Sequence, residues 1–408
     1  VKSNIFMDYV LINALLYIVT LFLYWRKNKE IDAGFVLLGL YTLVAIIGVL
    51  LLYYAEDKNY WKLTLWPYIY LYVVFMLFFR PFLRKKNHLL AISLYVKNVK
   101  FVNVIAFIYI TVAIIIILFN FNKTISVFLG GDWLAVRTSL YQGETILYES
   151  LAERIALNLF SYLRPLAIII FFYYLTKQNI RKRLKVLLAL AILIPSFILA
   201  ILLAARGSLF NIILEIIVVY LIFRKDIPKA TNRLIKLFFI LFLSFAISLV
   251  IGISTSRFGV KENFTMLLYY FGHSFMKFND GLVDTIHTYA NGNYFFSWFS
   301  EFFNTSNQLL STSIDQALGT HFGSSFTTFV GSLYIDFGPI LTLGLAVFVP
   351  IIISLAFKKR NYIGISGIYM YVFYLTYLLR GVFVIGSGNS LYWFGAIIIF
   401  TTLRILKV

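Results

Sequence analysis

The chain has 408 residues, of which 61% are hydrophobic and only 13% are charged. An ordinary soluble domain is about 45–50% apolar and about 25% charged, so this composition excludes a soluble enzyme, a coiled coil and a disordered protein. The absence of Cys excludes disulfides, thiolate metal sites and cysteine nucleophiles. We therefore expect an all-α polytopic membrane protein with a single integral membrane domain over residues 1–408.

Eleven predominantly apolar runs follow one another along the chain. A membrane helix needs about 20 such residues, so each run predicts one transmembrane helix. The ninth run is long and contains Pro339 and Pro350, which predicts a kink or a tilt. The predicted spans are residues 5–24, 34–54, 63–79, 101–120, 155–176, 186–204, 208–223, 237–255, 329–357, 362–379 and 391–406.

The formal charge of +19 is distributed according to topology. If the spans alternate in direction, 24 of the 36 Lys and Arg residues fall on one side of the membrane, together with only four of the 17 acidic residues. Short cytoplasmic loops carry such an excess of Lys and Arg. The pattern predicts an outside N-terminus and an inside C-terminus, and it argues against a nucleic-acid partner.

Two connections on the predicted outer side are long, at residues 121–154 and 256–328. Irregular loops of this length are uncommon unless they have a function or are disordered. The second loop is rich in Phe, Tyr and Trp, so disorder is not expected there. We expect it to form aromatic-rich helices on the membrane surface.

Two isolated arginines stand at the outer ends of predicted spans. Arg206 lies in the turn 204–208 among small residues, and Arg257 lies in the similar segment 254–259. A guanidinium stays charged and donates two parallel hydrogen bonds to phosphate. We expect the two residues to bind an anion together, whereas snorkelling towards lipid headgroups is the alternative.

The segment that follows offers a general base. His273, Lys277 and either Asp280 or Asp284 are spaced to share one helical face. We expect Lys277, with Tyr270 and Asn279 beside it, to bind substrate. A histidine close to a carboxylate is the best base candidate in the chain, and an amphipathic surface helix with ordinary ion pairs is the alternative. No spacing of His, Asp and Glu is diagnostic of a metal site, so we expect neither a metal nor another cofactor.

Further ionisable residues lie within or beside the apolar runs, where they are costly and usually face a cavity or a partner. Asp336 falls in the outer third of the ninth span, and His321 precedes that span. Arg164 lies within the fifth span and Arg380 closes the tenth. Asp336 is a second catalytic candidate, and the other three are candidates for substrate binding. Glu215 lies mid-span, where we expect a buried polar partner.

These residues collect at the predicted outer boundary of the membrane. Such a set suits a substrate with a lipid tail, an anionic head and a polar part outside, as in a polyprenyl-diphosphate-linked sugar. The chain has no Gly-rich phosphate loop and no pair of acids of the Asp-X-Asp kind, which disfavours a nucleotide-sugar enzyme.

The chain resembles bacterial oligosaccharide repeat-unit polymerases of the Wzy type, which act in O-antigen and capsule synthesis. The layout of the whole chain is similar, with many spans and a large outer loop near the C-terminal third, and the motifs cover about residues 204–340. The motifs are Ala205-Arg206-Gly207, Ser256-Arg257-Phe258-Gly259, Gly272-His273 with Asn279, and Phe326-Thr327 leading into Tyr334-Ile335-Asp336-Phe337-Gly338.

The resemblance implies a glycosyltransferase of the bacterial inner membrane whose active site faces the periplasm. It would transfer the growing chain from undecaprenyl diphosphate to an incoming lipid-linked repeat unit, without a cofactor, and release undecaprenyl diphosphate. Membrane lipids and a chain-length regulator are the further partners implied. Two alternatives stay open: a ligase-like transfer to another acceptor, and a flippase for the same lipid-linked sugar.

Overall fold

The computed structural model describes most of the chain. Its contacts divide the protein into two compact units, each assembled from separate segments. Unit 1 contains Val1–His88, Phe264–Arg360 and Tyr377–Ile398, and unit 2 contains Leu89–Asn263, Asn361–Thr376 and Ile399–Val408. The described residues are 2–54, 63–84, 93, 94, 96, 98–130, 135, 136, 150–177, 179–203, 206–282, 289, 292, 295, 296, 328–356, 362–382 and 389–406.

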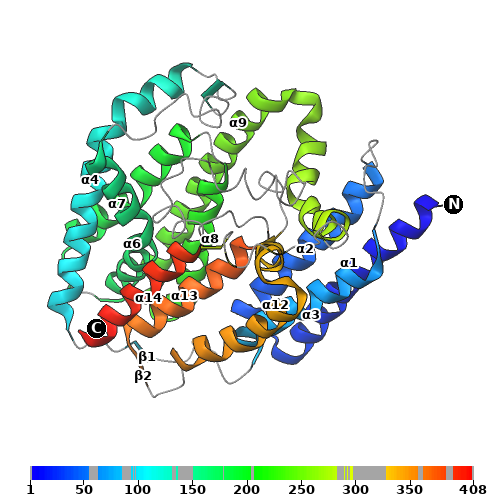
Figure 1. The fold of residues 1–408 in the computed structure, drawn as a ribbon. Coiled ribbons are helices and arrows are strands. Elements are labelled where there is room, and N and C mark those ends of the chain that lie inside the picture. Colours follow the sequence, from blue (N-terminus) through cyan, green and yellow to red (C-terminus); the bar gives the residue numbers. More distant parts are fainter. Residues whose placement is uncertain are drawn as a thin grey trace. The chain divides into compact units, whose positions relative to one another are not determined.

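Unit 1 is built from helices at both ends of the chain. Figure 1 shows α1, α2 and α3 side by side, and each contacts the other two. α12 packs along α3. The elements of unit 1 are α1 (Lys2–Asn28), α2 (Ala33–Tyr54), α3 (Leu65–Leu83), the end of α9 (Lys229–Lys277), the π-helix η3 (Phe278–Leu282), α12 (Thr328–Ala356), the end of α13 (Ile365–Arg380) and most of α14 (Asn389–Ile405).

Unit 2 is a second helical bundle in which α4 packs against both α6 and α7, and α8 packs against α6 and α7. One parallel pair of two-residue strands accompanies the helices, with Ser93 opposite Tyr362. The elements of unit 2 are β1 (Ser93–Leu94), α4 (Val99–Gly130), α6 (Leu151–Thr176), α7 (Lys182–Leu202), α8 (Arg206–Phe223), the first part of α9, β2 (Tyr362–Ile363), the first part of α13 and the end of α14.

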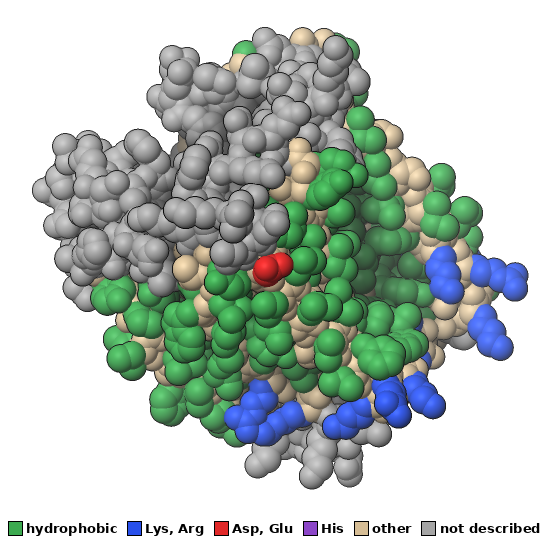
Figure 2. Space-filling model, turned by 90° about the vertical axis from the view of Figure 1, so that its right-hand side faces the viewer, with side chains coloured by type: hydrophobic (Ala, Val, Ile, Leu, Met, Phe, Trp, Pro, Cys, Tyr) green, Lys and Arg blue, Asp and Glu red, His purple; other side chains and the backbone are tan. Residues whose placement is uncertain are grey.

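The predicted all-α polytopic membrane fold is confirmed. Each of the eleven predicted spans falls on one helix, because in lipid a helix satisfies all of its own backbone hydrogen bonds. Among the described residues, eight helices are long and apolar enough to cross a membrane. The other three, α8, α13 and α14, are shorter, with 18, 16 and 17 residues. Figure 2 shows a broad band of hydrophobic side chains on one face, with Lys and Arg side chains along its lower and right-hand edges.

The helices extend further than their apolar runs. α4 continues to Gly130 and α9 continues to Lys277, so both predicted outer loops begin as helix. Hydropathy marks where the apolar stretch ends, whereas the ladder of backbone hydrogen bonds continues into polar sequence. Most of residues 131–149 and 283–327, including the predicted surface helices after residue 282, lie outside the described residues.

The basic helix ends of unit 1 meet at one end of that unit. The hydroxyl of Tyr24 donates a 2.8 Å hydrogen bond to Asp32 and a 3.4 Å hydrogen bond to the carbonyl of Phe82. These contacts join the end of α1, the start of α2 and the end of α3. Arg26 and Arg80, which the charge pattern assigns to the inner side of the membrane, lie at these same helix ends, as alternating spans require.

Candidate functional site

The first turns of α12 form a buried segment of unit 1 that carries polar side chains. Every residue of 328–336 is buried, and three of them, Thr328, Ser332 and Asp336, carry polar side chains. The helix is then interrupted at Gly338, whose φ of 69° is not helical, before Pro339. Buried polar groups in a membrane-spanning helix are costly, which makes this segment a candidate functional site.

The start of α12 is fixed against the end of α13. The amide of Phe329 donates a 2.8 Å hydrogen bond to the carbonyl of Gly381. A Cβ at Gly381 would lie only 2.5 Å from the Phe329 ring, so glycine is required for this approach. The contact brings Arg380 to the beginning of α12, where its Nη1 donates a 3.3 Å hydrogen bond to the hydroxyl of Tyr392. Arg380, predicted to bind substrate, thus lies beside the first turn of α12.

Asp336 and the kink after it contact Phe295 and Tyr289. The carboxylate of Asp336, with no exposed surface, accepts a 2.6 Å hydrogen bond from the amide of Phe295. A Cβ at Gly338 would lie 2.8 Å from the ring of Tyr289, which packs at the kink. Asp336, predicted as catalytic, is therefore placed as a residue that positions the segment containing Tyr289 and Phe295.

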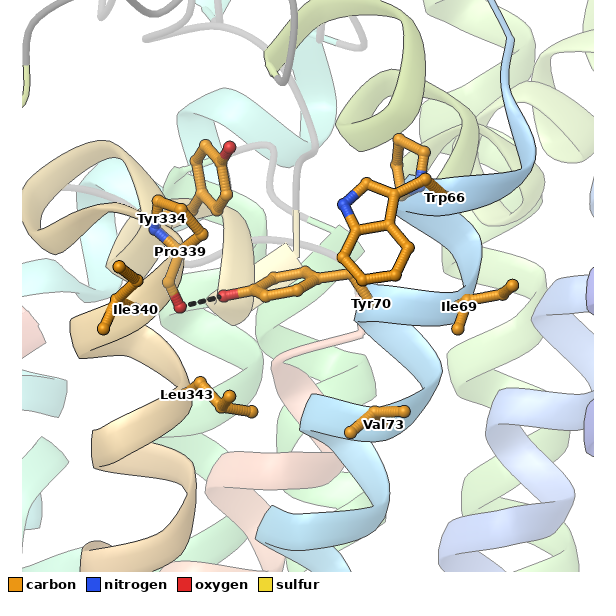
Figure 3. Close-up of a pocket in the computed structure, with 9 residues that line it drawn as sticks. Trp66, Ile69, Tyr70, Val73, Tyr334, Pro339, Ile340 and Leu343 are labelled. Carbon is orange, nitrogen blue, oxygen red and sulfur yellow. Dashed lines mark hydrogen bonds between the residues drawn. The ribbon is translucent and has the colours of Figure 1, made fainter.

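An apolar cavity of about 310 Å³ lies between α3 and α12 (Figure 3). The hydroxyl of Tyr70 crosses from α3 and donates a 2.8 Å hydrogen bond to the carbonyl of Pro339. Trp66, which stands on the same wall, is 66% exposed. The lining residues are Trp66, Pro67, Ile69, Tyr70, Val73, Tyr334, Pro339, Ile340 and Leu343.

Four aromatic rings form a continuous cluster beside this cavity. Tyr334 makes edge contacts with Tyr70, Phe278 and Tyr289 at centroid distances of 5.8, 5.5 and 6.3 Å. Phe278 and Tyr70 stack in parallel at 6.2 Å. Edge and stacked geometries of this kind are favourable. The cluster connects α3, η3 and α12 and fixes the wall of the cavity.

His273 lies near the end of α9 and is almost buried. Its ring stacks on Tyr269 with a centroid distance of 4.2 Å. Burial, with Lys277 one turn away, lowers the pKa of His273 from 6.5 to about 4. The imidazole is therefore neutral at pH 7 and does not act as an anion-binding cation.

Asn279 serves as a clamp between η3 and α3. Its side chain accepts a 2.9 Å hydrogen bond from the amide of Thr64 and donates a 2.6 Å hydrogen bond to the carbonyl of the same residue. Both polar ends of the amide bind protein backbone. Asn279, predicted to bind substrate, thus has a structural role at the start of α3.

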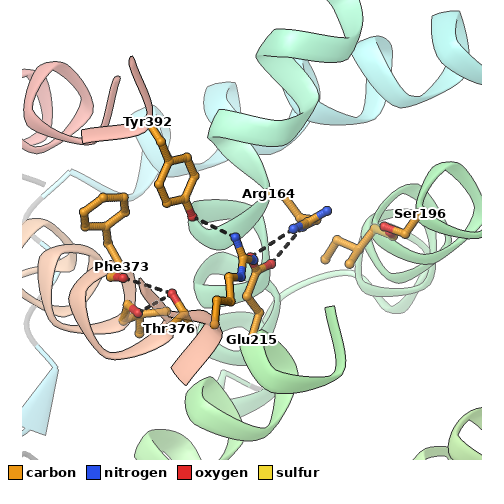
Figure 4. A network of polar contacts seen from close by, with 9 residues as sticks. Arg164, Ser196, Glu215, Phe373, Thr376 and Tyr392 are labelled. Carbon is orange, nitrogen blue, oxygen red and sulfur yellow. Dashed lines mark hydrogen bonds and ion pairs between the residues drawn. The ribbon is translucent and has the colours of Figure 1, made fainter. Parts of the chain in front are cut away.

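Arg164 and Glu215 form an ion pair inside unit 2 (Figure 4). Nε and Nη2 of Arg164, on α6, donate hydrogen bonds of 2.8 and 3.0 Å to the two carboxylate oxygens of Glu215, on α8. Glu215 has no exposed surface, so the expectation of a buried polar partner for it is confirmed. The partner is the arginine that we had predicted to bind substrate.

The remaining predicted residues have no described side chains. Arg206 is the first residue of α8, and both Arg257 and Tyr270 lie within α9. His321 falls outside the described residues. Arg206 and Arg257 belong to unit 2, whereas His273 and Asp336 belong to unit 1. That Arg206 and Arg257 bind one anion together stays a prediction.

The sequence reasoning overlooked the α3 wall of the cavity. Trp66 and Tyr70 were assigned only to the third predicted span. A signal was present, since the run Trp66-Pro67-Tyr68-Ile69-Tyr70 places several large aromatic residues at the outer start of one span. Within the described ranges, no group of three His, Asp or Glu residues is placed to hold a metal ion.

Comparison with protein-family models, curated proteins and solved structures finds no match to this chain.

Proposed function

We propose that the protein is a glycosyltransferase of the bacterial inner membrane that polymerises undecaprenyl-diphosphate-linked repeat units at the periplasmic face. The observation that carries this proposal is the cavity between α3 and α12. It combines an apolar lining with aromatic side chains at the helix ends that the charge pattern assigns to the outside. The sequence resemblance to Wzy-type polymerases supports the same reaction.

The cavity suits the part of a lipid-linked sugar that lies at the membrane boundary. Its aliphatic lining, including Val73 and Leu343, offers hydrocarbon contacts to the first isoprene units of the tail. Trp66 and Tyr289 are 66% and 39% exposed and offer flat faces on which sugar rings stack. Aromatic side chains favour such an interface because one part is apolar and another is polar.

The diphosphate needs cationic partners, and no cationic side chain belongs to the described lining of the cavity itself. Arg380 is only partly exposed at the junction of α13 and α12, and its guanidinium suits phosphate oxygens. Arg206 and Arg257 are the further candidates from the sequence. In this scheme the arginines stabilise the negative charge that develops on the leaving undecaprenyl diphosphate, which is commonly the largest contribution to catalysis.

The reaction is a transfer between two lipid-linked sugars. The bond between the anomeric carbon of the donor chain and the diphosphate oxygen breaks, and the acceptor hydroxyl oxygen bonds to that carbon. His273 is the candidate general base for the hydroxyl proton that the sequence offers. Asp336 acts as a positioning residue through its hydrogen bond to Phe295. No cofactor takes part, and a chain-length regulator is the proposed protein partner.

The test uses purified protein in nanodiscs, supplied with undecaprenyl-diphosphate-linked repeat units and no nucleotide sugar. We expect a product ladder spaced by one repeat unit. Transfer of a single chain to a different acceptor would instead identify a ligase, and movement of intact substrate across the bilayer would identify a flippase.

The same assay tests the role of Arg380. The Arg380→Ala variant should lose at least about tenfold in rate, as expected for a loss of at least about 1.4 kcal/mol of transition-state stabilisation. Arg404→Ala is the matched control. Arg404 is exposed near the C-terminal end of α14, whereas Tyr392, the partner of Arg380, lies near the start of that helix. Equal rates for both variants would remove Arg380 from the proposed site.

A further inference from the structure

A second cavity, of about 400 Å³, lies within unit 2 and has no part in the proposed reaction. It is formed by α6, α7, α8 and α9. Of its 17 lining residues, 15 are hydrophobic, and the other two are Lys185 and Thr231. Water is retained in a cavity when it finds two to four polar partners. This lining is therefore suited to hydrocarbon.

The cavity is open sideways to the membrane. Val186 on α7 and both Leu234 and Phe238 on α9 line it, yet they are 57%, 67% and 54% exposed. Side chains that line a cavity and are also exposed mark its opening. In a membrane-spanning bundle, such an opening faces lipid.

The depth of the cavity matches one leaflet. Along α7 its wall extends from Lys185 to Leu193, which corresponds to a rise of about 12 Å. The hydrocarbon core of a bilayer is about 30 Å thick, so one leaflet spans about half of that. The cavity begins at the first turns of α7 and α9 and ends near the middle of the bilayer.

The mouth of the cavity is strongly basic. Lys185 belongs to the wall itself, and the first turns of α7 and α9 carry exposed basic residues. In the described segments 179–203 and 206–248 the acidic residues are Glu215, which pairs with Arg164, and Asp226. A headgroup at this mouth is therefore favoured when it is negatively charged. The exposed basic residues are Arg181, Lys182, Arg183, Lys229, Arg233 and Lys236.

We propose that this cavity binds one acyl chain of an anionic phospholipid, whose phosphate lies at Lys185, in the leaflet that borders the basic ends of α7 and α9. The apolar lining holds the chain, and the lysine selects the headgroup. The proposal is independent of the glycosyltransferase reaction, because the cavity lies within unit 2 and contains none of the residues assigned to that reaction.

The experiment measures the fraction of immobilised lipid by electron paramagnetic resonance. Full-length protein is reconstituted in phosphatidylcholine vesicles that contain either spin-labelled phosphatidylglycerol or spin-labelled phosphatidylcholine. We expect the protein to immobilise the anionic lipid with about fivefold preference, the effect of one cation near a membrane surface. Added inorganic phosphate should leave the preference in place, because free phosphate has no acyl chain.

Two pairs of variants distinguish the contribution of the lipid headgroup to binding from that of the acyl chain. Lys185→Gln should reduce the preference to near one, whereas Lys182→Gln, which alters a basic residue outside the lining, should largely keep it. Ala189→Trp fills the cavity and should reduce the immobilised fraction of both lipids. Leu187→Trp, on the exposed face of α7 outside the lining, should not.

Equal immobilisation of the two lipids by the unmodified protein would overturn the proposal. An unchanged preference in Lys185→Gln, or equal effects of the two Trp variants, would also overturn it. If Ala189→Trp fails to fold, the Lys185→Gln and Lys182→Gln pair still decides the result, because both substitutions replace partly or fully exposed side chains at the helix start.

Discussion

Asn279 binds both the amide and the carbonyl of Thr64, a residue 215 positions away in the chain. The two hydrogen bonds, of 2.9 and 2.6 Å, join the π-helix after α9 to the residue that precedes α3. α3 forms one wall of the cavity that we propose for the substrate. The two hydrogen bonds of Asn279 therefore fix the end of α3 at which this cavity lies.

Replacing Asn279 by Ala removes both partners of Thr64. A typical intramolecular hydrogen bond contributes about 0.5–1.5 kcal/mol, so the loss of two should lower the midpoint of thermal unfolding in detergent. Asn122→Ala is the control, because Asn122 is exposed on α4 and should change the stability by less than about 0.5 kcal/mol. Similar unfolding midpoints for both variants would show that the hydrogen bonds between Asn279 and Thr64 do not stabilise the protein.

Gly272 permits a close contact between α9 and α2. A Cβ at this position would lie 2.8 Å from the amide nitrogen of Gly48 and from the carbonyl oxygen of Ile47. Gly272→Ala should therefore force the helices apart and destabilise the protein by about 1–3 kcal/mol.

Gly252 provides the matched control in the same helix. A Cβ at Gly252 meets no atom within 4 Å, and alanine is favoured over glycine in a helix by about 1 kcal/mol. Gly252→Ala should be neutral or stabilising in the same unfolding measurement. A stable Gly272→Ala variant would contradict the packing of α9 on α2.

The Arg164–Glu215 pair predicts strong energetic coupling. Removing one partner of a buried ion pair costs about 3–5 kcal/mol because it leaves an uncompensated charge, so Glu215→Leu and Arg164→Leu should each be severely destabilised. The double variant should recover much of the loss. A double-mutant cycle of unfolding free energies checks this, and additive effects would contradict a structural pair.

The low pKa of His273 makes the stability depend on pH. Between pH 6.5 and about 4 the unfolded state binds a proton that the folded state does not. Neutral His273 therefore makes its full contribution to the free energy of unfolding above pH 6.5. That contribution, on the order of 3 kcal/mol, is lost as the pH falls towards 4. His273→Gln should flatten this part of the profile of unfolding midpoint against pH. An equally steep fall in that variant would assign the effect to other groups.

The kink in α12 predicts a separate effect on activity. Gly338→Ala places a side chain at a φ of 69° and 2.8 Å from the ring of Tyr289, which should displace the segment beside the cavity and reduce the rate of polymer formation. Gly344→Ala, later in the same helix, meets no atom within 4 Å and should keep the rate. The polymerisation assay with repeat units in nanodiscs compares the two, and equal rates would remove the kink from the site.

The sequence predicted the membrane helices well because the signal for a span is local. Each apolar run is read without knowledge of any other, and each corresponds to a helix. Their ends were less accurate: α9 continues 22 residues beyond the predicted end at 255, to Lys277. Polar residues such as those around Arg257 end the apolar run without ending the helix.

The site was less predictable because its residues come together only in the fold. Tyr70 and Pro339 are 269 positions apart, and no pattern in the sequence pairs them. Arg164, Asn279 and Asp336 were recognised as unusual polar residues, and all three lie at polar contacts. Their partners, Glu215, Thr64 and Phe295, give them structural roles that residue type alone does not reveal.

The central claim is that the cavity between α3 and α12 receives the lipid-linked donor. The most direct measurement is photo-crosslinking with an undecaprenyl-diphosphate-linked repeat unit that carries a diazirine in its first isoprene units, followed by mass spectrometry of the labelled peptides. The account predicts labelling of Trp66, Tyr70 and Leu343 that an excess of unlabelled donor abolishes. Leu118, 76% exposed on α4, serves as the lipid-facing control, whose labelling should resist competition. Competable labelling confined to other helices, with none on α3 or α12, would contradict the account.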